Sequence, residues 1–243
     1  MHPDYFWNRD TQDITRHVGE LALQNEPLLR ANCQEVSRQT DTSCSRLQEE
    51  SHAKEQALNA TVKSVVEILH RLVQILSANA NVFGTKDSRT DFSAVCQAVV
   101  GVEEARVRLI AEIAALSNVR HSLAASVANA NRALHYLSVA TASVPKDQRS
   151  FYAEAFQKTE MTYQHLLALD TTLQKWQDAY MSLVELHFST FLQKVRTAAD
   201  FAHAGAALQS VTLRSLCGEM LLLLERLARS AFDENCDEKL RNS

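Results

Sequence analysis

A helical pattern of apolar positions extends from Val95 to Val144 and organises the rest of the chain. Apolar or small residues recur in alternating steps of three and four, which keeps one seam on the same side of a supercoiled helix. The seam comprises Val95, Val99, Val102, Leu109, Ile113, Leu116, Leu123, Val127, Ala130, Leu134, Leu137, Thr141 and Val144. No proline interrupts it, so the pattern predicts one helix roughly 75 Å long at about 1.5 Å per residue. Such a helix cannot bury its own stripe and needs long partners.

The sequence before this stretch predicts a first long helix that begins near Thr11 or Asp13. Pro27 lacks a backbone donor and is expected to start a turn or to bend the helix. Residues 37–56 are nearly all polar and fit either a solvated helix or a loop that starts near Asp41. Helix is favoured, because residues 46–58 contain no breaker. The apolar seam then returns as Leu58, Val62, Val65, Leu69, Leu72 and Leu76.

Two connections separate three long helices in this pattern. Residues 79–90 are rich in turn formers, and a short turn at Pro145 requires the helix that starts near Asp147 to run back antiparallel. A break of this third helix near Gly205 is an open alternative. The expected fold is therefore all-α, three long antiparallel helices in a coiled-coil bundle. Residues 1–232 are expected to form a single elongated domain, and residues 233–243 an acidic frayed tail.

The composition supports the helical interpretation and limits the partners. Only 5 glycines and 3 prolines occur in 243 residues, which leaves too few breakers for many short strands and turns. The net charge is −4. Nucleic acid is not expected as a partner, because phosphate binding requires clustered Lys and Arg.

The cysteines and the apolar runs indicate a cytoplasmic protein. Five scattered cysteines without any CxxC spacing are typical of reduced thiols in a reducing compartment. The N-terminal ten residues carry acids and aromatics where a secretory signal would carry a basic run and an apolar core. No apolar run approaches the length of about 20 residues that spans a bilayer. Attachment to a membrane would therefore be peripheral.

The sequence offers little chemistry for catalysis. Two Glu-x-x-His pairs, Glu49 with His52 and Glu67 with His70, have the spacing of di-iron bundles, but both fall on one predicted helix. Those sites need such pairs on facing helices. No phosphate loop, HExxH or nucleophile elbow is present. The sequence therefore predicts no enzyme, no cofactor and no metal site.

Basic residues gather on both helices around the Pro145 turn. The candidate contacts for anionic lipid or an acidic partner are Arg132, Lys146, Arg149 and Lys158. Asp147, Glu154 and Glu160 dilute this charge, and a hydrated hairpin end is the simpler interpretation.

Arg106 and Arg120 are the only breaks in the Val95–Val144 seam. A lone charge buried at a seam position destabilises the fold. The two side chains are expected either to pair with acids across the interface, which would fix the register, or to extend out of it into solvent. Pairing is slightly favoured.

The third helix and the segment after it carry more apolar surface than the hairpin is expected to cover. An exposed stripe of that kind marks an interface, and a second copy of the chain is the expected occupant. A helix of another protein is the alternative. The candidate interface residues are Trp176, Tyr180, Phe188, Phe191, Met220, Leu223 and Leu227.

The third helix also resembles the BAR-domain superfamily, and most closely the ciliary BAR-domain proteins. The similar residues are Leu173 to Trp176, then Leu183, Phe188, Ser189, Phe191, Leu192 and Ala202. The resemblance implies a crescent-shaped homodimeric scaffold that senses or imposes membrane curvature, at the base of cilia. From another class, the sequence also fits a helical protein-binding adaptor or a coiled-coil subunit of a cytoskeletal complex that binds no lipid.

Overall fold

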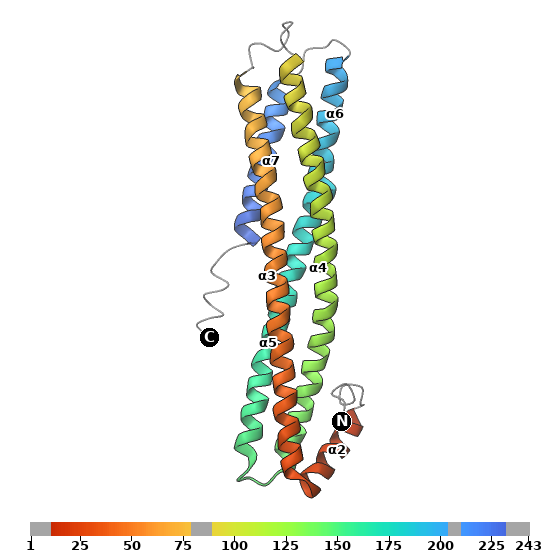
Figure 1. Ribbon diagram of the computed structural model, residues 1–243, viewed down its shortest axis with the longest axis vertical. Coiled ribbons are helices and arrows are strands. Elements are labelled where there is room, and N and C mark those ends of the chain that lie inside the picture. The colour runs from red at the N-terminus through yellow and green to blue at the C-terminus, as the bar shows by residue number, and fades with distance from the viewer. Residues whose placement is uncertain (1–10, 79–88, 204–209, 232–243) are drawn as a thin grey trace. The chain divides into compact units, whose positions relative to one another are not determined.

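Helices make up the part of the chain that the structure describes except for Asn25 and the turn at 144–148. The computed structural model describes residues 11–78, 89–203 and 210–231, with side chains at 11–75, 77, 96–197 and 214–225. Figure 1 shows α3 and α4 as long continuous helices. The elements are α2 (Thr11–Gln24), α3 (Glu26–Ala78), α4 (Arg89–Ser143), α5 (Arg149–Ser182), the π-helical segment η2 (Leu183–Phe188), α6 (Ser189–His203) and α7 (Ser210–Ala231). No strand occurs among these residues, which confirms the all-α class.

The chain divides into two compact units. Unit 1 comprises Met1–His52 and Ser117–Gln174, and unit 2 comprises Ala53–Leu116 and Lys175–Ser243. All three boundaries fall inside helices, since α3, α4 and α5 each contribute residues to both units. The single domain expected over residues 1–232 stays a prediction. The connection expected at 79–90 falls largely outside the described residues, as do the Gly205 break and the tail at 233–243.

Pro27 comes just after the break between α2 and α3, as expected of a residue that cannot continue a helix. It lies in the first turn of α3, where a missing N–H leaves no hydrogen bond unmade. Asn25 separates α2 from α3 and caps the new helix. Its backbone carbonyl accepts hydrogen bonds from the N–H groups of Leu28 and Leu29, both at 3.1 Å, and its side-chain oxygen accepts from Leu28 at 3.3 Å. The predicted turn or bend at Pro27 is confirmed.

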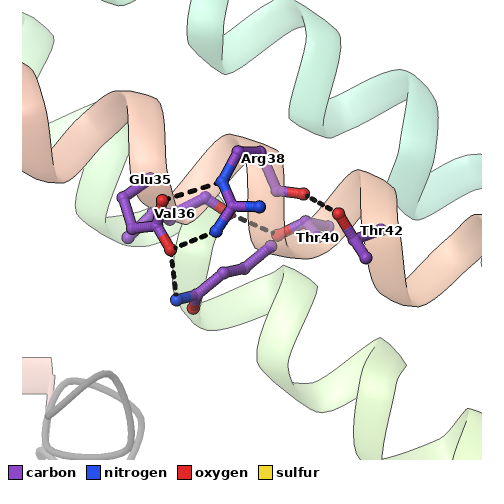
Figure 2. Close-up of polar contacts among 6 residues, drawn as sticks. Glu35, Val36, Arg38, Thr40 and Thr42 are labelled. Atoms are coloured by element: carbon purple, nitrogen blue, oxygen red, sulfur yellow. Dashed lines mark hydrogen bonds and ion pairs between the residues drawn. The ribbon is translucent and has the colours of Figure 1, made fainter.

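The polar stretch 37–56 is continuous helix within α3, as favoured from the sequence. Charged pairs one turn apart support its exposed face. The Glu35 carboxylate accepts hydrogen bonds from Arg38 Nε and Nη2 at 2.8 and 2.7 Å and from Gln39 Nε2 at 2.8 Å (Figure 2). The Arg38 and Gln39 donors hold the pKa of Glu35 down at about 2. Arg46 and Glu50 form a further pair at 3.7 Å.

The inward face of the same stretch buries hydroxyl groups that have partners on the preceding turn. Thr40 Oγ1 donates to the carbonyl of Val36 at 2.9 Å (Figure 2), and Ser51 Oγ donates to that of Leu47 at 2.6 Å. A buried hydroxyl without such a partner would destabilise the helix. These bonds explain why a stretch with few apolar residues still packs inward.

The core of unit 1 joins four helical segments. The contacts between α3 and α5 rise together along the two helices, from Glu26–Tyr152 to Ser37–Thr159, so these segments run in the same direction. Segment α4 runs opposite to α5, because only the short turn at Pro145 connects them. The apolar cluster of this unit consists of Ile14, Val18, Leu29, Cys33, Tyr136, Leu137, Ala140, Val144 and Tyr152.

Unit 2 has a core of its own. A contact of 3.2 Å between Lys54 Nζ and Glu112 Oε2 and the close approach of Gly101 to Ile68 show that α3 and α4 run antiparallel here. Segment α7 packs against α6. The buried apolar residues are Leu58, Val62, Val65, Leu69, Leu72, Val102, Ala105, Leu109, Ile113, Leu116, Tyr180, Leu183, Val184, Phe188, Phe191, Leu192, Val195, Cys217, Met220 and Leu224.

The predicted seam of α4 is correct in its main members and incomplete in its small ones. Eight of the predicted positions are buried: Val102, Leu109, Ile113, Leu116, Leu123, Ala130, Leu137 and Val144. The structure adds Ala105, Val119, Ala133, Tyr136 and Ala140, all buried. Val99, Val127, Leu134 and Thr141, which were predicted in the seam, are only half-buried. Three of the five added positions are alanines, which allow close approaches between helices.

Candidate functional site

The π-helical segment η2 shifts the buried stripe by one residue. Buried positions recur every seven residues through Leu166, Leu173 and Tyr180. The next in line, Phe188, comes eight residues after Tyr180, and Val195 follows after seven more. A single wide turn absorbs such an extra residue, and turns of this kind are frequent at functional sites. The register of α6 therefore depends on η2.

The side chain of Ser189 donates a hydrogen bond to a backbone carbonyl group where the helix widens. Ser189 Oγ donates to the carbonyl oxygen of Val184 at 3.2 Å, five residues back. The Ser189 N–H donates to the carbonyl of Leu186. These two bonds occupy carbonyl groups that the wide turn would otherwise leave without donors.

The extra residue turns Leu186 outward, beside a groove between η2–α6 and α7. The side chain of Leu186 is 60% exposed, and Leu222 of α7 is 58% exposed. The groove has a volume of about 500 Å³. Its lining is Leu186, His187, Thr190, Phe191, Lys194, Leu216, Glu219, Met220, Leu222 and Leu223. We call this the α6–α7 groove.

The charges of the α6–α7 groove lie on opposite elements. Lys194 is exposed on α6, and Glu219 is exposed on α7. Apolar side chains make up the rest of the lining except for His187 and Thr190. Glu219 is the one carboxylate among these lining residues. The arrangement is suited to holding an apolar surface between two charged edges.

The expected dimer interface is largely internal to unit 2. Four of its members are buried within the single chain: Tyr180 (1% exposed), Phe188 (0%), Phe191 (3%) and Met220 (4%). The expectation that the chain could not cover this stripe is wrong for them, because other segments of the same chain already bury them. The charge of Glu55 on α3 acts on Tyr180, and α7 packs against α6. Trp176 and Leu223 are half-buried, and the side chain of Leu227 lies outside the described residues. The stripe instead forms part of the core and the floor of the α6–α7 groove.

The basic residues expected around the Pro145 turn do not gather as one cluster. Lys146 and Arg149 are exposed at the turn, where Arg149 Nε donates to the Val144 carbonyl at 3.2 Å. Arg132 is exposed on α4, eleven residues before that helix ends, which corresponds to about 16 Å. Lys158 forms an ion pair with Asp41 of α3.

Asp41 also accepts a hydrogen bond from Thr162 Oγ1 at 2.7 Å. The Asp41 carboxylate therefore neutralises Lys158 and ties α3 to α5. Two of the four predicted contacts, Lys146 and Arg149, remain together at the turn.

The two arginines of the α4 seam have different partners. Arg120 Nε lies 3.4 Å from Asp170 Oδ1 of α5, which confirms pairing with an acid across the interface. Arg106 Nη1 lies 2.9 Å from Glu103 Oε1 on its own helix. The other oxygen of Glu103 lies 4.0 Å from Arg196 of α6, so Glu103 links Arg106 to the facing helix.

Buried titratable groups in both units are held in their neutral forms. Burial raises the pKa of the Cys33 and Cys217 thiols to about 12. Burial, together with the charge of Glu55, raises the pKa of Tyr180 to about 12. A thiol with a raised pKa is a poor nucleophile. Cys33 and Cys217 are therefore structural groups.

The residues considered for a metal site do not converge. Glu49, His52, Glu67 and His70 are all exposed on α3. Among the residues that the structure describes, no three His, Cys, Asp or Glu side chains form a group that could hold a metal ion. Within the same residues, no helix has the length and apolar character needed to cross a bilayer.

Comparison of the chain with protein families, curated proteins and solved structures finds no match.

Proposed function

We propose that this chain is a non-enzymatic helical adaptor that binds an amphipathic helix of a partner protein in the α6–α7 groove. In this proposal α3, α4 and α5–α6 are the three long antiparallel helices of a coiled-coil bundle, and the bundle carries the groove. The observation that supports it is the apolar lining beside exposed Leu186 and Leu222, with Lys194 on α6 and Glu219 on α7. Grooves of this character accept helices through apolar anchors.

The charges of the groove define the partner. A helix that presents leucines at i, i+3, i+4 and i+7 fills an apolar groove between two helices. Its edge beside Lys194 should be acidic, and its edge beside Glu219 should be basic. Charge arrangement of this kind sets partner choice and orientation more than it sets affinity.

Synthetic peptides test this proposal by fluorescence anisotropy. The probe is a labelled amphipathic helix with leucines at the four anchor positions, acids along one edge and bases along the other. We expect Lys194→Glu to weaken binding at least about tenfold, which corresponds to about 1.4 kcal/mol. A peptide with an all-basic edge in place of the acidic one should bind the variant better than the original chain.

A matched substitution on another helix gives the control. Leu222→Glu should abolish peptide binding, whereas Met161→Glu, at a similarly exposed apolar position on α5, should leave it unchanged. Equal effects of these two substitutions, or binding that ignores the charge of residue 194, would refute the adaptor.

The second candidate is the BAR-like homodimeric scaffold on an anionic membrane, which the resemblance would place at the ciliary base. The observation that favours it is the exposure of Lys146 and Arg149 at the α4–α5 turn. Each basic side chain near an anionic surface contributes about 1 kcal/mol. Co-sedimentation with vesicles that contain phosphatidylserine tests it.

Paired charge reversals make that test specific. Reversal of both Lys146 and Arg149 to Glu should remove salt-sensitive vesicle binding. Lys158→Glu should have a smaller effect, because Asp41 already neutralises Lys158. Absence of vesicle binding at low salt would exclude this candidate and leave the adaptor.

A further inference from the structure

Helix α4 carries a second stripe of residues in unit 2. These residues are exposed, and most of them are apolar. The stripe repeats in steps of three and four, as the buried seam does. Val100 and Val107 are each 57% exposed, and Ile110 beside them is 43% exposed. The positions of the stripe are Gln97, Val100, Glu104, Val107, Ala111 and Ala114, all exposed.

The stripe is separate from the face that α4 presents to its own chain. Val102, Ala105 and Leu109 are fully buried. A Cβ atom added to Gly101 would lie 3.1 Å from Ile68 Cδ1, so this side of α4 already packs tightly on α3. A helix that is apolar on both faces is normally buried on both. The second face of α4 therefore lacks a partner within the described residues.

We infer that this stripe binds the same stripe of a second copy of the chain, with the two α4 helices antiparallel. An antiparallel coiled coil places each a position opposite a d position of its partner. With the twofold axis between Ala105 and Arg106, Val100 falls opposite Ala111, and Glu104 falls opposite Val107. Gln97 falls opposite Ala114 at each end of the contact. Every layer is then made twice by symmetry, as an isologous interface requires.

The only charge in the stripe supports this pairing. Glu104 and Arg108 are both exposed and lie four residues apart, yet neither has an ion-pair partner among the described residues. In the antiparallel dimer Glu104 lies opposite Val107 of the second copy and next to its Arg108. The symmetry forms this pair twice. A parallel dimer would instead set Glu104 against Glu104.

The size of the side chains fits a close contact between helices. Four of the six layer positions are alanine or valine. Interaxial distance follows the side chains at the contact, so small residues bring the helices near the short end of the range of about 8–10 Å. The longer Gln97 lies in the outermost layer opposite a small alanine, where its amide can stay hydrated. This interface does not involve the α6–α7 groove, and it is independent of the proposed function.

Charge exchange tests the pairing by sedimentation velocity over a range of concentrations. Glu104→Arg and Arg108→Glu should each raise the dimer dissociation constant about tenfold. Each substitution gives residues 104 and 108 the same charge, so two pairs of like charges meet across the interface. An equimolar mixture of these two variants should return to within a few fold of the original constant. In the mixed dimer, the arginine introduced at position 104 of one copy faces the glutamate introduced at position 108 of the other. The second contact keeps the original pair of Arg108 and Glu104.

Substitution within an apolar layer tests the stripe itself. Val107→Glu removes two buried valines from the dimer and sets each introduced carboxylate against Glu104, and should raise the dissociation constant about a hundredfold or more. Met161→Glu on α5 is the matched control and should leave the dimer intact. Unchanged folding of each variant is read from its helical circular dichroism.

Cysteine cross-linking reports the direction of the helices. In a background with Cys96→Ser and Cys236→Ser, a mixture of Gln97→Cys and Ala114→Cys chains should cross-link, and neither variant alone should. Positions 97 and 114 are about 25 Å apart along one helix. Cross-linking of either variant by itself, a monomer at about 100 μM, or a dimer that is insensitive to Val107→Glu would each overturn the inference.

Discussion

Deletion of Leu186 should be tolerated, although it removes a residue from the middle of a helix. The deletion would place Phe188 seven residues after Tyr180, so that η2 can close into ordinary α-helix. The buried residues Phe188, Phe191 and Val195 would keep their positions in the stripe. The deletion costs the hydrogen bond from Ser189 to Val184, about 1 kcal/mol, and regains a regular helical bond of similar worth.

A deletion in α3 gives the contrast, because no wide turn is available there to absorb it. Lys63 is exposed, and its removal would rotate every later residue by about 100°. Val65, Leu69 and Leu72, all at most 1% exposed, would leave the core. At about 1.5–3 kcal/mol for each side chain, the loss is about 4.5–9 kcal/mol. That is comparable to the whole stability of a typical domain.

Urea unfolding followed by far-UV circular dichroism measures both deletions. We expect the Leu186 deletion to change the free energy of unfolding by no more than about 1 kcal/mol with an unchanged denaturant slope. Deletion of Glu185 should behave in the same way, since it restores the same spacing. The Leu186 deletion should also abolish peptide binding, because it removes an exposed apolar side chain that lines the α6–α7 groove. A loss of stability as large as that of the Lys63 deletion would refute the role assigned to η2.

Three further predictions concern buried polar groups. Ser37→Ala should lower the free energy of unfolding by about 1–3 kcal/mol by leaving Thr159 without its partner at 3.2 Å, whereas adding Thr159→Val should restore most of it in a double-mutant cycle. Iodoacetamide should label Cys96 in the folded protein and leave Cys33 unlabelled until urea unfolds the chain, as peptide mass mapping will show. Because the pKa of Tyr180 is raised to about 12 in the folded protein, folded Tyr180 keeps its proton between about pH 10 and pH 12, whereas the unfolded chain loses it. The contribution of Tyr180 to the free energy of unfolding is therefore complete below about pH 10 and is lost as pH rises toward about 12. Tyr180→Phe should flatten that decline in urea titrations.

The helical pattern identified which segments form helices more securely than which surfaces they share. The polar stretch 37–56 was expected to be helix, and the turns at Pro27 and Pro145 were located, because breakers and charged pairs act within a few residues. The interface assigned to Tyr180, Phe188 and Met220 failed for a different reason. Whether a stripe is covered depends on where a distant segment returns, and no local pattern contains that information.

The sequence contains a sign of the π-helical turn, but the turn could not be predicted from the periodicity alone. The interval of eight residues between Tyr180 and Phe188 interrupts a repeat of seven. Steps of seven and eight both occur along the inward faces of helices, so the interval is ambiguous until neighbouring helices define the inward direction. The π-helical conformation of Leu183–Phe188 in the structure then identifies a wide turn.

The sequence by itself determined an all-α chain and the inward seam of α4, because breakers are scarce and an apolar face must be buried. It also indicated that Arg106 and Arg120 either pair with acids across the seam or extend out of it into solvent. Only the tertiary structure decided that Arg120 reaches Asp170, that α7 packs against α6, and that α4 keeps a second apolar face exposed. These outcomes rest on contacts between segments remote in the chain, whose geometry is fixed by packing and not by local pattern.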